Sequence, residues 1–172
     1  MKGLLPVSAS LILAVLMHAD VGGQEPKAPP EMNPLERLLG TWDVEQRARV
    51  PDEGRSTNTV KRELVLGGRF VQEMGGFDEN GKATHMGTYT YDSNRKTYRW
   101  WFFHSSGFYH ESTGSWNEGS QTFTFVNRLE GGGAGTTTIH FQDDTNFDFS
   151  IIVKDGGGKV TYHLEGTAVR QE

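Results

Sequence analysis

All six prolines of the chain lie at or before Pro51, and none occurs from there to Glu172. Proline cannot donate a backbone hydrogen bond, so a strand that is paired on both edges excludes it. Short clusters of Gly, Asn, Asp and Ser divide the same stretch at hairpin spacing, as turns do. The pattern predicts that the chain after Pro51 is continuous antiparallel sheet.

About ten segments between these turn clusters have the alternation and the β-branched or aromatic residues of strands. They are residues 42–50, 57–66, 69–76, 83–91, 96–104, 108–116, 121–129, 136–142, 146–153 and 159–169. In the first of them Trp42 and Val44 share one face, while Asp43 and Glu45 share the other. Each strand is therefore expected to bury one face and expose the other.

A meander of this many strands must remove its edges, either by closing on itself or by stacking into a sandwich. We expect closure, which gives an all-β fold: a single antiparallel up-and-down β-barrel of about ten strands with one short N-terminal helix. The helix is predicted at residues 33–40, with Asn33 as its cap and Gly40 as its stop. It would plug one mouth of the barrel and place Trp42 on the floor, where the indole N–H needs a partner.

The N-terminal segment is typical of an exported protein. Residues 1–23 combine Lys2, an apolar core and a small-residue cleavage site, which predicts a signal peptide cleaved after Gly23, with Ala19 as the alternative. The apolar stretch is shorter than the roughly 20 residues that span a bilayer, so no membrane anchor is expected. Residues 24–33 form a Pro-rich linker without a packing role, residues 34–172 form the barrel domain, and the location is periplasmic or secreted.

Composition excludes several kinds of partner and site. The formal charge is −5 and the sequence lacks a basic run, so nucleic acid is not an expected partner. Because there is no cysteine, a thiol nucleophile, a thiolate metal site and a disulfide framework are all excluded.

The segments 38–42, 66–73, 87–92 and 96–102 together carry a family resemblance. The Leu-Leu-Gly-Thr-Trp segment resembles the G-x-W opening of lipocalins and fatty-acid-binding proteins. With the other three, the chain resembles a family of bacterial, often exported lipocalin-like proteins catalogued as a domain of unknown function. The resemblance implies a calycin-type barrel and no catalytic residues. Fatty-acid-binding proteins insert two helices after their first strand, whereas here only residues 51–56 join the first two strands.

A weaker likeness is to nitrobindin-type haem barrels, which also open with G-T-W and place a histidine in an H-L context in the last strand. His163 and Leu164 occupy that context here. Alternation places His163 on the outer face, with Tyr162 and Leu164 inside. We therefore expect no cofactor, and keep haem as an alternative.

The polar residues form no pattern that predicts a metal site or a catalytic centre. His104 and His110 flank one turn, and whether they share a face depends on the length of that turn. Two ligands do not make a metal site, so none is expected. No Ser-His-Asp arrangement or nucleophile elbow is present, so no catalytic residue is assigned. An enzyme remains a third class, which convergent titratable side chains inside the barrel would favour.

Aromatic side chains on both faces of the segment 96–104 are the most unusual feature. One set is expected to line the interior, and an aromatic-lined interior is typical of a site for a small hydrophobic ligand. Arg62 and Gln72 are candidate interior polar anchors. The predicted ligand-binding residues are Trp42, Arg62, Gln72, Tyr89, Trp100 and Phe102. The alternative is an interaction or scaffold protein with a filled core, whose outer aromatic face docks a partner or a second copy in a homodimer.

Overall fold

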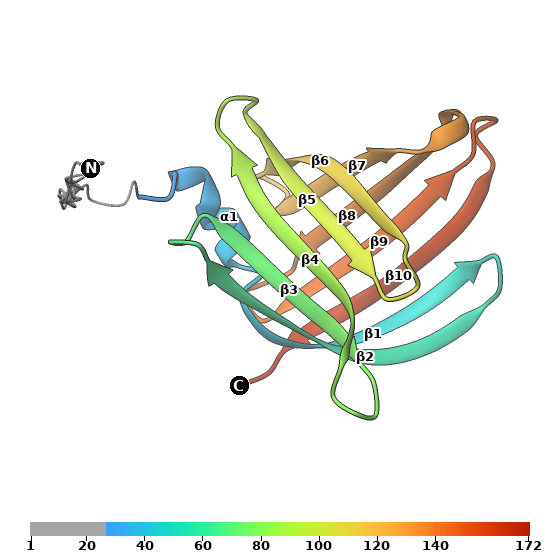
Figure 1. Ribbon diagram of the computed structural model, residues 1–172, viewed down its shortest axis with the longest axis horizontal. Helices are drawn as coiled ribbons and strands as arrows, with labels where there is room; N and C mark the ends of the chain where they lie inside the picture. The colour runs from blue at the N-terminus through green and yellow to red at the C-terminus, as the bar shows by residue number, and fades with distance from the viewer. Residues whose placement is uncertain (1–26) are drawn as a thin grey trace, which may run out of the picture.

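Each alternating segment of the sequence forms one strand in the computed structural model, which describes residues 27–172 (Figure 1). The strands are β1 (Gly40–Val50), β2 (Gly54–Val65), β3 (Phe70–Phe77), β4 (Ala83–Asp92), β5 (Thr97–His104), β6 (Tyr109–Asn117), β7 (Thr122–Arg128), β8 (Ala134–Phe141), β9 (Asn146–Lys154) and β10 (Val160–Arg170). The largest difference from the expected bounds is the start of β2, because Gly54 to Ser56 extend the first hairpin against Ala48 to Gln46. The expected signal peptide, residues 1–23, lies outside the described residues.

The ten strands close into an antiparallel up-and-down barrel, which confirms the predicted fold. Each strand pairs with the next, and β1 closes the barrel by pairing with β10, where Trp42 lies opposite Arg170. Residues 51–53 join β1 to β2 without a helix, as expected from the sequence. Closure removes the unpaired backbone groups that an edge strand would present.

A short helical segment precedes the barrel and covers one of its ends (Figure 1). It consists of a 3-10 turn, η1 (Pro30–Met32), one α-helical turn, α1 (Asn33–Glu36), and the turn formed by Arg37 and Leu38. The expected cap at Asn33 is wrong, because the helical turns begin at Pro30 and place Asn33 inside them without a capping bond from a side chain. The absence of a packing role for residues 24–33 is also wrong, since Met32 is buried in the core.

The covered end of the barrel is solidly packed. Met32, Leu35 and Leu38 from the helical segment are buried against the aromatic core residues. Burying each of them contributes about 1.5–3 kcal/mol. The indole N–H of Trp42 donates to the carbonyl of Leu38 at 2.8 Å, which confirms both its expected place on the floor and its need for a partner. We call this half of the molecule the closed end.

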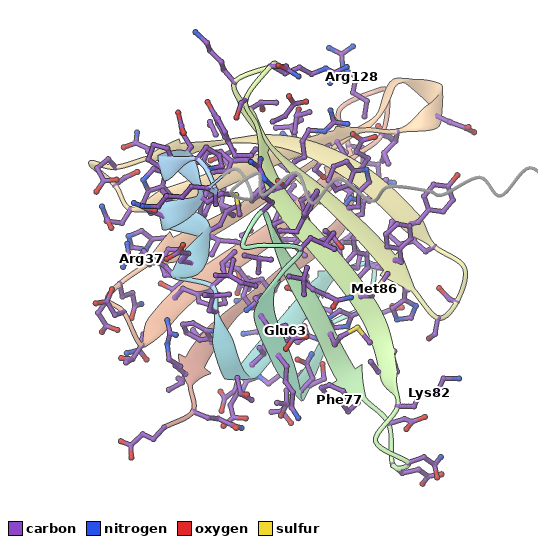
Figure 2. The ribbon with its side chains drawn as sticks, turned by 60° about the vertical axis from the view of Figure 1, so that its left-hand side comes forward. Arg37, Glu63, Phe77, Lys82, Met86 and Arg128 are labelled. Atoms are coloured by element: carbon purple, nitrogen blue, oxygen red, sulfur yellow. The ribbon has the colours of Figure 1, made fainter. Side chains whose placement is uncertain are left out.

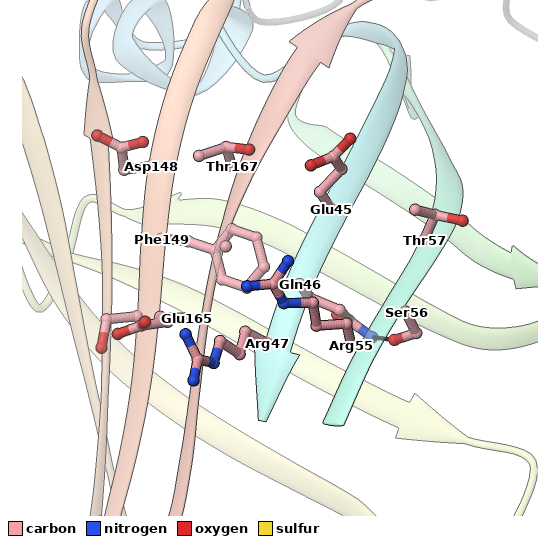
Figure 3. A pocket seen from close by; sticks show the side chains of 12 residues that line it. Glu45, Gln46, Arg47, Arg55, Ser56, Thr57, Asp148, Phe149, Glu165 and Thr167 are labelled. Atoms are coloured by element: carbon pink, nitrogen blue, oxygen red, sulfur yellow. Dashed lines mark hydrogen bonds between the residues drawn. The ribbon is translucent and has the colours of Figure 1, made fainter. Parts of the chain in front are cut away.

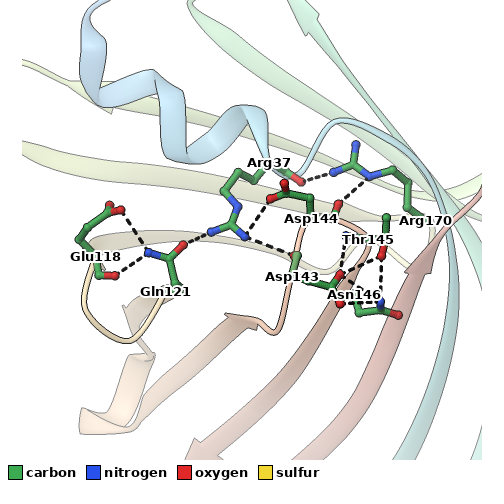
Figure 4. A network of polar contacts seen from close by, with 8 residues as sticks. All are labelled: Arg37, Glu118, Gln121, Asp143, Asp144, Thr145, Asn146 and Arg170. Atoms are coloured by element: carbon green, nitrogen blue, oxygen red, sulfur yellow. Dashed lines mark hydrogen bonds and ion pairs between the residues drawn. The ribbon is translucent and has the colours of Figure 1, made fainter.

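Two arginines fasten the helical segment to the barrel (Figure 4). Arg37 donates to Gln121 and to Asp144, the latter at 3.2 Å, which ties the segment to two strand connections. Arg170 donates to the carbonyl of Arg37 at 2.9 Å, and its guanidinium lies 4.5 Å from the ring centre of Trp42. The two arginines therefore hold the helical segment and the floor together.

The opposite end of the barrel is open. Figure 2 shows Arg37 on the helical segment at one end and Lys82, in the turn between β3 and β4, at the other. A further 3-10 turn, η2 (Glu130–Gly132), lies between β7 and β8. None of the three helical turns in the described part of the chain is long and apolar enough to cross a bilayer.

Candidate functional site: the open half of the barrel lumen

The open half of the barrel encloses a cavity of about 670 Å³. We call this cavity the lumen. On the side of β3 to β6 it is lined by Glu73, Gly76, Thr84, His85, Tyr89, Trp100, Phe102, His104, Ser106, Phe108 and His110. On the remaining strands and turns it is lined by Val44, Gln46, Asn58, Val60, Arg62, Asn127, Leu129, Thr137, Ile139, Phe147, Phe149, Ile151, Val153, Tyr162 and Leu164. The first wall is aromatic and polar, whereas the second combines seven aliphatic side chains with three aromatic and five polar ones.

A polar cluster lies at the deep end of the lumen. The Arg62 guanidinium donates from Nε to Glu73 Oε2 at 2.7 Å, and the side chains of this pair are only 7% and 5% exposed. The Tyr89 hydroxyl donates to the same carboxylate oxygen at 2.9 Å. His85 Nε2 lies 3.6 Å from the other oxygen, Oε1. Glu73 is thus the centre to which three neighbouring side chains converge.

The charges in this cluster are set by burial and by the ion pair. Burial would raise the pKa of Glu73, but the charges of Arg62 and His85 and the bonds from Arg62 and Tyr89 outweigh it and lower the pKa below its usual value. Burial raises the pKa of Tyr89 well above its usual value. Glu73 is therefore ionised and Tyr89 neutral at physiological pH.

Histidines continue the polar wall from the cluster toward the mouth. His85 lies directly opposite His104 on β4 and β5. Phe102 lies between His85 and His110, with ring centres 5.4 Å from each. Burial lowers the pKa of His85, against a smaller opposing effect of Glu73, and burial also lowers the pKa of His110. Both imidazoles are consequently neutral at neutral pH.

Three residues that line the lumen each have a buried polar atom without a hydrogen-bond partner among the described residues. These atoms are Arg62 Nη1, Trp100 Nε1 and Asn58 Oδ1. Most buried polar groups in proteins are hydrogen-bonded, and each exception calls for an explanation.

Glycines on the inner face make room for the large side chains of this site. A Cβ on Gly75 would lie 2.5 Å from His85 Nε2, and a Cβ on Gly87 would lie 3.1 Å from Trp100 Nε1. Gly166 likewise makes room for Phe149, because a Cβ on Gly166 would lie 2.6 Å from the Phe149 ring. Glycines on one strand therefore lie next to bulky side chains of the neighbouring strands.

Four of the six predicted ligand-binding residues line the lumen: Arg62, Tyr89, Trp100 and Phe102. Trp42 does not, because it lies beneath the cavity in the closed end. Gln72 as an interior anchor is wrong, since it lies on the outer face, where its amide contacts Met86 Sδ at 3.8 Å.

Glu73 is the site residue that the sequence reasoning missed. The apolar neighbours Phe70 and Met74 suggested that even-numbered residues of this strand face inward. The barrel instead turns Val71 and Glu73 inward, with Glu73 directly opposite Arg62 on β2. The complementary charge of Arg62 could have indicated Glu73, because the sequence predicts that Arg62 faces the interior and a buried arginine needs an acidic partner.

The haem alternative rested on His163, and the position of this residue does not fit an interior haem. His163 lies on the outer face, as alternation predicted, and its Nε2 is 3.7 Å from Glu165. Tyr162 and Leu164, its neighbours in β10, line the lumen. No group of three or more His, Asp or Glu side chains within residues 27–172 is arranged to hold a metal ion.

The turn between β5 and β6 decides whether His104 and His110 lie on the same face of the sheet. His104 pairs with Phe108 through its backbone, and His110 lies opposite Phe102. Residues 105–107 therefore connect the paired residues His104 and Phe108, and both imidazoles face the lumen.

A second hollow, of about 800 Å³, lies on the outer face of β1, β2, β9 and β10 (Figure 3). Some charged side chains on its rim pair with neighbours outside the hollow, as Arg47 does with Glu53 at 3.3 Å and Glu165 with Arg49. Among the described residues, none of the buried unpartnered polar atoms belongs to a residue that lines this hollow, whereas three belong to residues that line the lumen. The lumen is therefore the stronger candidate for a binding site.

The second set of aromatic side chains lies on the outer face. Phe103 is 41% exposed and Tyr109 72% exposed, and their rings stack 6.5 Å apart. Their register continues across Met86 on β4 to Met74 on β3, so these four residues form one row across four strands. We call this set the outer apolar row.

Comparison with known proteins supports the fold. A family model described as "Protein of unknown function (DUF1579)" matches residues 27–170. The structure is similar to that of Rv2717c from M. tuberculosis, with a TM-score of 0.61 and 16% identity over 85% of this chain and 100% of that chain. It is also similar to the S-type phycobiliprotein lyase CPES from Guillardia theta, with a TM-score of 0.52 and 14% identity over 80% of this chain and 90% of that chain. At these identities the two likenesses concern the barrel fold alone. The search of the curated proteins found no match.

Proposed function

The chain belongs to the DUF1579 family, whose function is unknown, and from the geometry of the lumen we propose that this barrel binds a small, largely apolar molecule. The observation that carries the proposal is an open cavity of about 670 Å³ whose lining is rich in aromatic and aliphatic side chains. Sites for small molecules have volumes of roughly 300–1,000 Å³, mostly apolar linings and few polar groups that fix orientation. The family match agrees with the resemblance noted in the sequence.

The convergent titratable groups that would favour an enzyme are present, but they are engaged with one another. Glu73 Oε2 accepts hydrogen bonds from both Arg62 and Tyr89. A general base must instead be free to accept a proton from a substrate. The cluster is therefore better suited to anchoring a ligand than to transferring its protons.

A neutral apolar probe tests the proposal. N-phenyl-1-naphthylamine fluoresces strongly in apolar sites, and we expect the purified protein to bind it in the lumen. Ile151→Trp adds a bulky ring inside the cavity, whereas Ile152→Trp adds the same ring at the next position of β9, on the outer face. We expect the first variant to weaken binding at least about tenfold, the effect of losing ~1.4 kcal/mol, and the second to leave it unchanged.

Two results would refute binding in the lumen. One is the absence of any fluorescence change with the unmodified protein. The other is equal binding by the two tryptophan variants when circular dichroism shows that both are folded, because that would place the probe on the outer surface.

The outer apolar row favours a second candidate function, self-association into a homodimer. Exposed apolar patches on soluble proteins often mark contacts with other proteins. Phe103→Ser combined with Tyr109→Ser would reduce the sedimentation coefficient of the protein if this row formed the contact. A monomeric unmodified protein at high concentration would exclude this function.

We also propose that the protein is exported to the periplasm or secreted, because residues 1–23 have the pattern of a signal peptide. The mass and N-terminal sequence of the protein recovered outside the cytoplasm test this. A start at Gln24 or Asp20 supports export with cleavage, and retention of Met1 on protein found only in the cytoplasm contradicts it.

A further inference from the structure

Two of the unpartnered atoms of the residues that line the lumen are hydrogen-bond donors on almost fully buried side chains. Arg62 is 7% exposed and its Nη1 has no partner, although its Nε is bound to Glu73. Trp100 is 5% exposed and its Nε1 has no partner. A buried donor left unsatisfied costs about 1–3 kcal/mol. An acceptor from a ligand would recover this cost at both atoms.

The two donors lie on either side of the same carboxylate. Arg62 reaches Glu73 through Oε2 at 2.7 Å. Trp100 Nε1 and Glu73 Oε1 lie 3.1 Å and 3.2 Å from the position that a Cβ on Gly87 would take. Because Gly87 has no side chain, the indole N–H and the carboxylate share the space in front of this residue. Both donors therefore belong to side chains that contact the Glu73 carboxylate region at the deep end of the lumen.

The charge around these donors is already balanced. Arg62 and Glu73 are the only Arg, Lys, Asp or Glu side chains that line the lumen, and their charges cancel. Burial lowers the pKa of His85 and of His110, so neither histidine supplies a positive charge at neutral pH. A ligand carboxylate would therefore enter beside the ionised Glu73 without a counterion of its own. Burying an unpaired charge is costly, whereas a neutral acceptor avoids this cost.

We propose that the ligand carries uncharged acceptor groups, such as the carbonyl of an amide, ketone or ester, one of which accepts a hydrogen bond from Trp100 Nε1 and another from Arg62 Nη1. This inference rests on the proposed function and adds the chemical class of the ligand. Asn58 Oδ1, a buried acceptor without a partner farther along β2, fits the same class, because it would repel an anion and accept from an N–H or O–H. The aromatic body of such a ligand would lie along Tyr89, Trp100 and Phe102.

Three probes that share one body and differ in the polar group test the proposal. They are 2-naphthamide, 2-naphthoate and 2-methylnaphthalene, whose binding is measured by equilibrium dialysis at neutral pH. We expect the amide to bind at least about tenfold more tightly than the other two, the effect of one net hydrogen bond. Trp100→Phe keeps an aromatic ring and removes the donor, whereas Trp101→Phe is the matched change on the outer face.

Trp100→Phe should weaken binding of the amide about tenfold more than it weakens binding of 2-methylnaphthalene, and Trp101→Phe should change neither. Tighter binding of 2-naphthoate than of the amide would overturn the inference, because the site would then be an anion site. Equal binding of all three probes would also overturn it and leave the proposed function intact. Failure of all three to bind would refute the inference and the proposed function together.

Discussion

Trp42 and Trp100 are both almost fully buried inside the same barrel, yet their environments differ. Trp42 lies in the closed end, where its indole N–H is bound to Leu38 at 2.8 Å and its ring packs 4.7 Å from that of Phe147. Trp100 lines the lumen, where its ring stacks on Tyr89 at 5.4 Å and its N–H has no partner. The N–H of Trp42 is therefore hydrogen-bonded, whereas the N–H of Trp100 still lacks an acceptor.

The two ends of the barrel therefore differ in what they contribute to the protein. The closed end buries the helical segment and the aromatic floor, so that it stabilises the fold. The open half keeps a cavity and unsatisfied donors, which lowers stability but leaves groups available to a ligand. Polar residues at a binding site often reduce stability in this way.

The largest expected effect concerns Trp42 on the floor of the closed end, where a substitution tests whether this end stabilises the fold more than the open half does. Trp42→Ala removes a large packed ring and the bond to Leu38, and we expect it to lower the free energy of unfolding by about 5 kcal/mol, the upper end of the range for such truncations. Trp100→Phe, which trims a ring beside a cavity, should lower it by less than about 1 kcal/mol. Urea denaturation followed by circular dichroism measures both values. Equal losses would show that the two halves contribute alike to stability.

The ion pair of the lumen should give the next largest effect. Arg62→Met leaves the Glu73 carboxylate buried without its cation, and we expect a loss of about 3 kcal/mol, the lower end of the range because water in the lumen can reach the carboxylate. In the double variant with Glu73→Gln the charge is gone and Tyr89 keeps an acceptor. We therefore expect the double variant to regain at least half of the loss in the same urea titration. Additive losses from the two single changes would contradict this coupling.

Acid should give the smallest effect, through His85 and His110. The pKa of each is lowered by burial in the folded state, whereas in the unfolded chain each takes up a proton near pH 6.5. As the pH falls below about 6.5, the unfolded state gains protons that the folded state does not, so the melting temperature falls. Below the lowered folded-state pKa values the loss is complete.

Differential scanning calorimetry between pH 7.5 and pH 5 measures this decline. His85→Gln combined with His110→Gln should flatten it, and His140→Gln, at an exposed histidine on the outer face, should not. An unmodified protein whose melting temperature is constant over this interval would contradict the neutral state assigned to the two buried histidines.

The strand interiors of β5, β7 and β9 illustrate what could be predicted without coordinates. Phe123 and Phe125 alternate with threonines, and both are buried as expected. The rings of β5 divide between the lumen and the outer face, which the period of two residues requires. Strong alternation therefore predicted the direction of the side chains as well as the position of the strand.

The β3 strand illustrates where this reasoning fails. Its apolar residues occupy both faces, so the pattern did not favour one orientation, and the orientation chosen placed Gln72 inside instead of Glu73. Only the pairing of Arg62 with Glu73 on the neighbouring strand decides between them. A one-residue shift of register reverses every side chain, and local sequence alone does not resolve it where both faces are mixed.

The sequence by itself determined that the chain is an up-and-down barrel with a helical plug, because the distribution of proline, the turn residues and alternation are local properties. The tertiary structure alone decided which half of that barrel is filled and which is hollow, and which polar atoms are left without partners. These depend on how side chains from strands far apart in the chain meet around a common axis, with glycines on one strand admitting the rings of the next. Volume and hydrogen-bond satisfaction are properties of that assembly, so they become visible only when the barrel is closed.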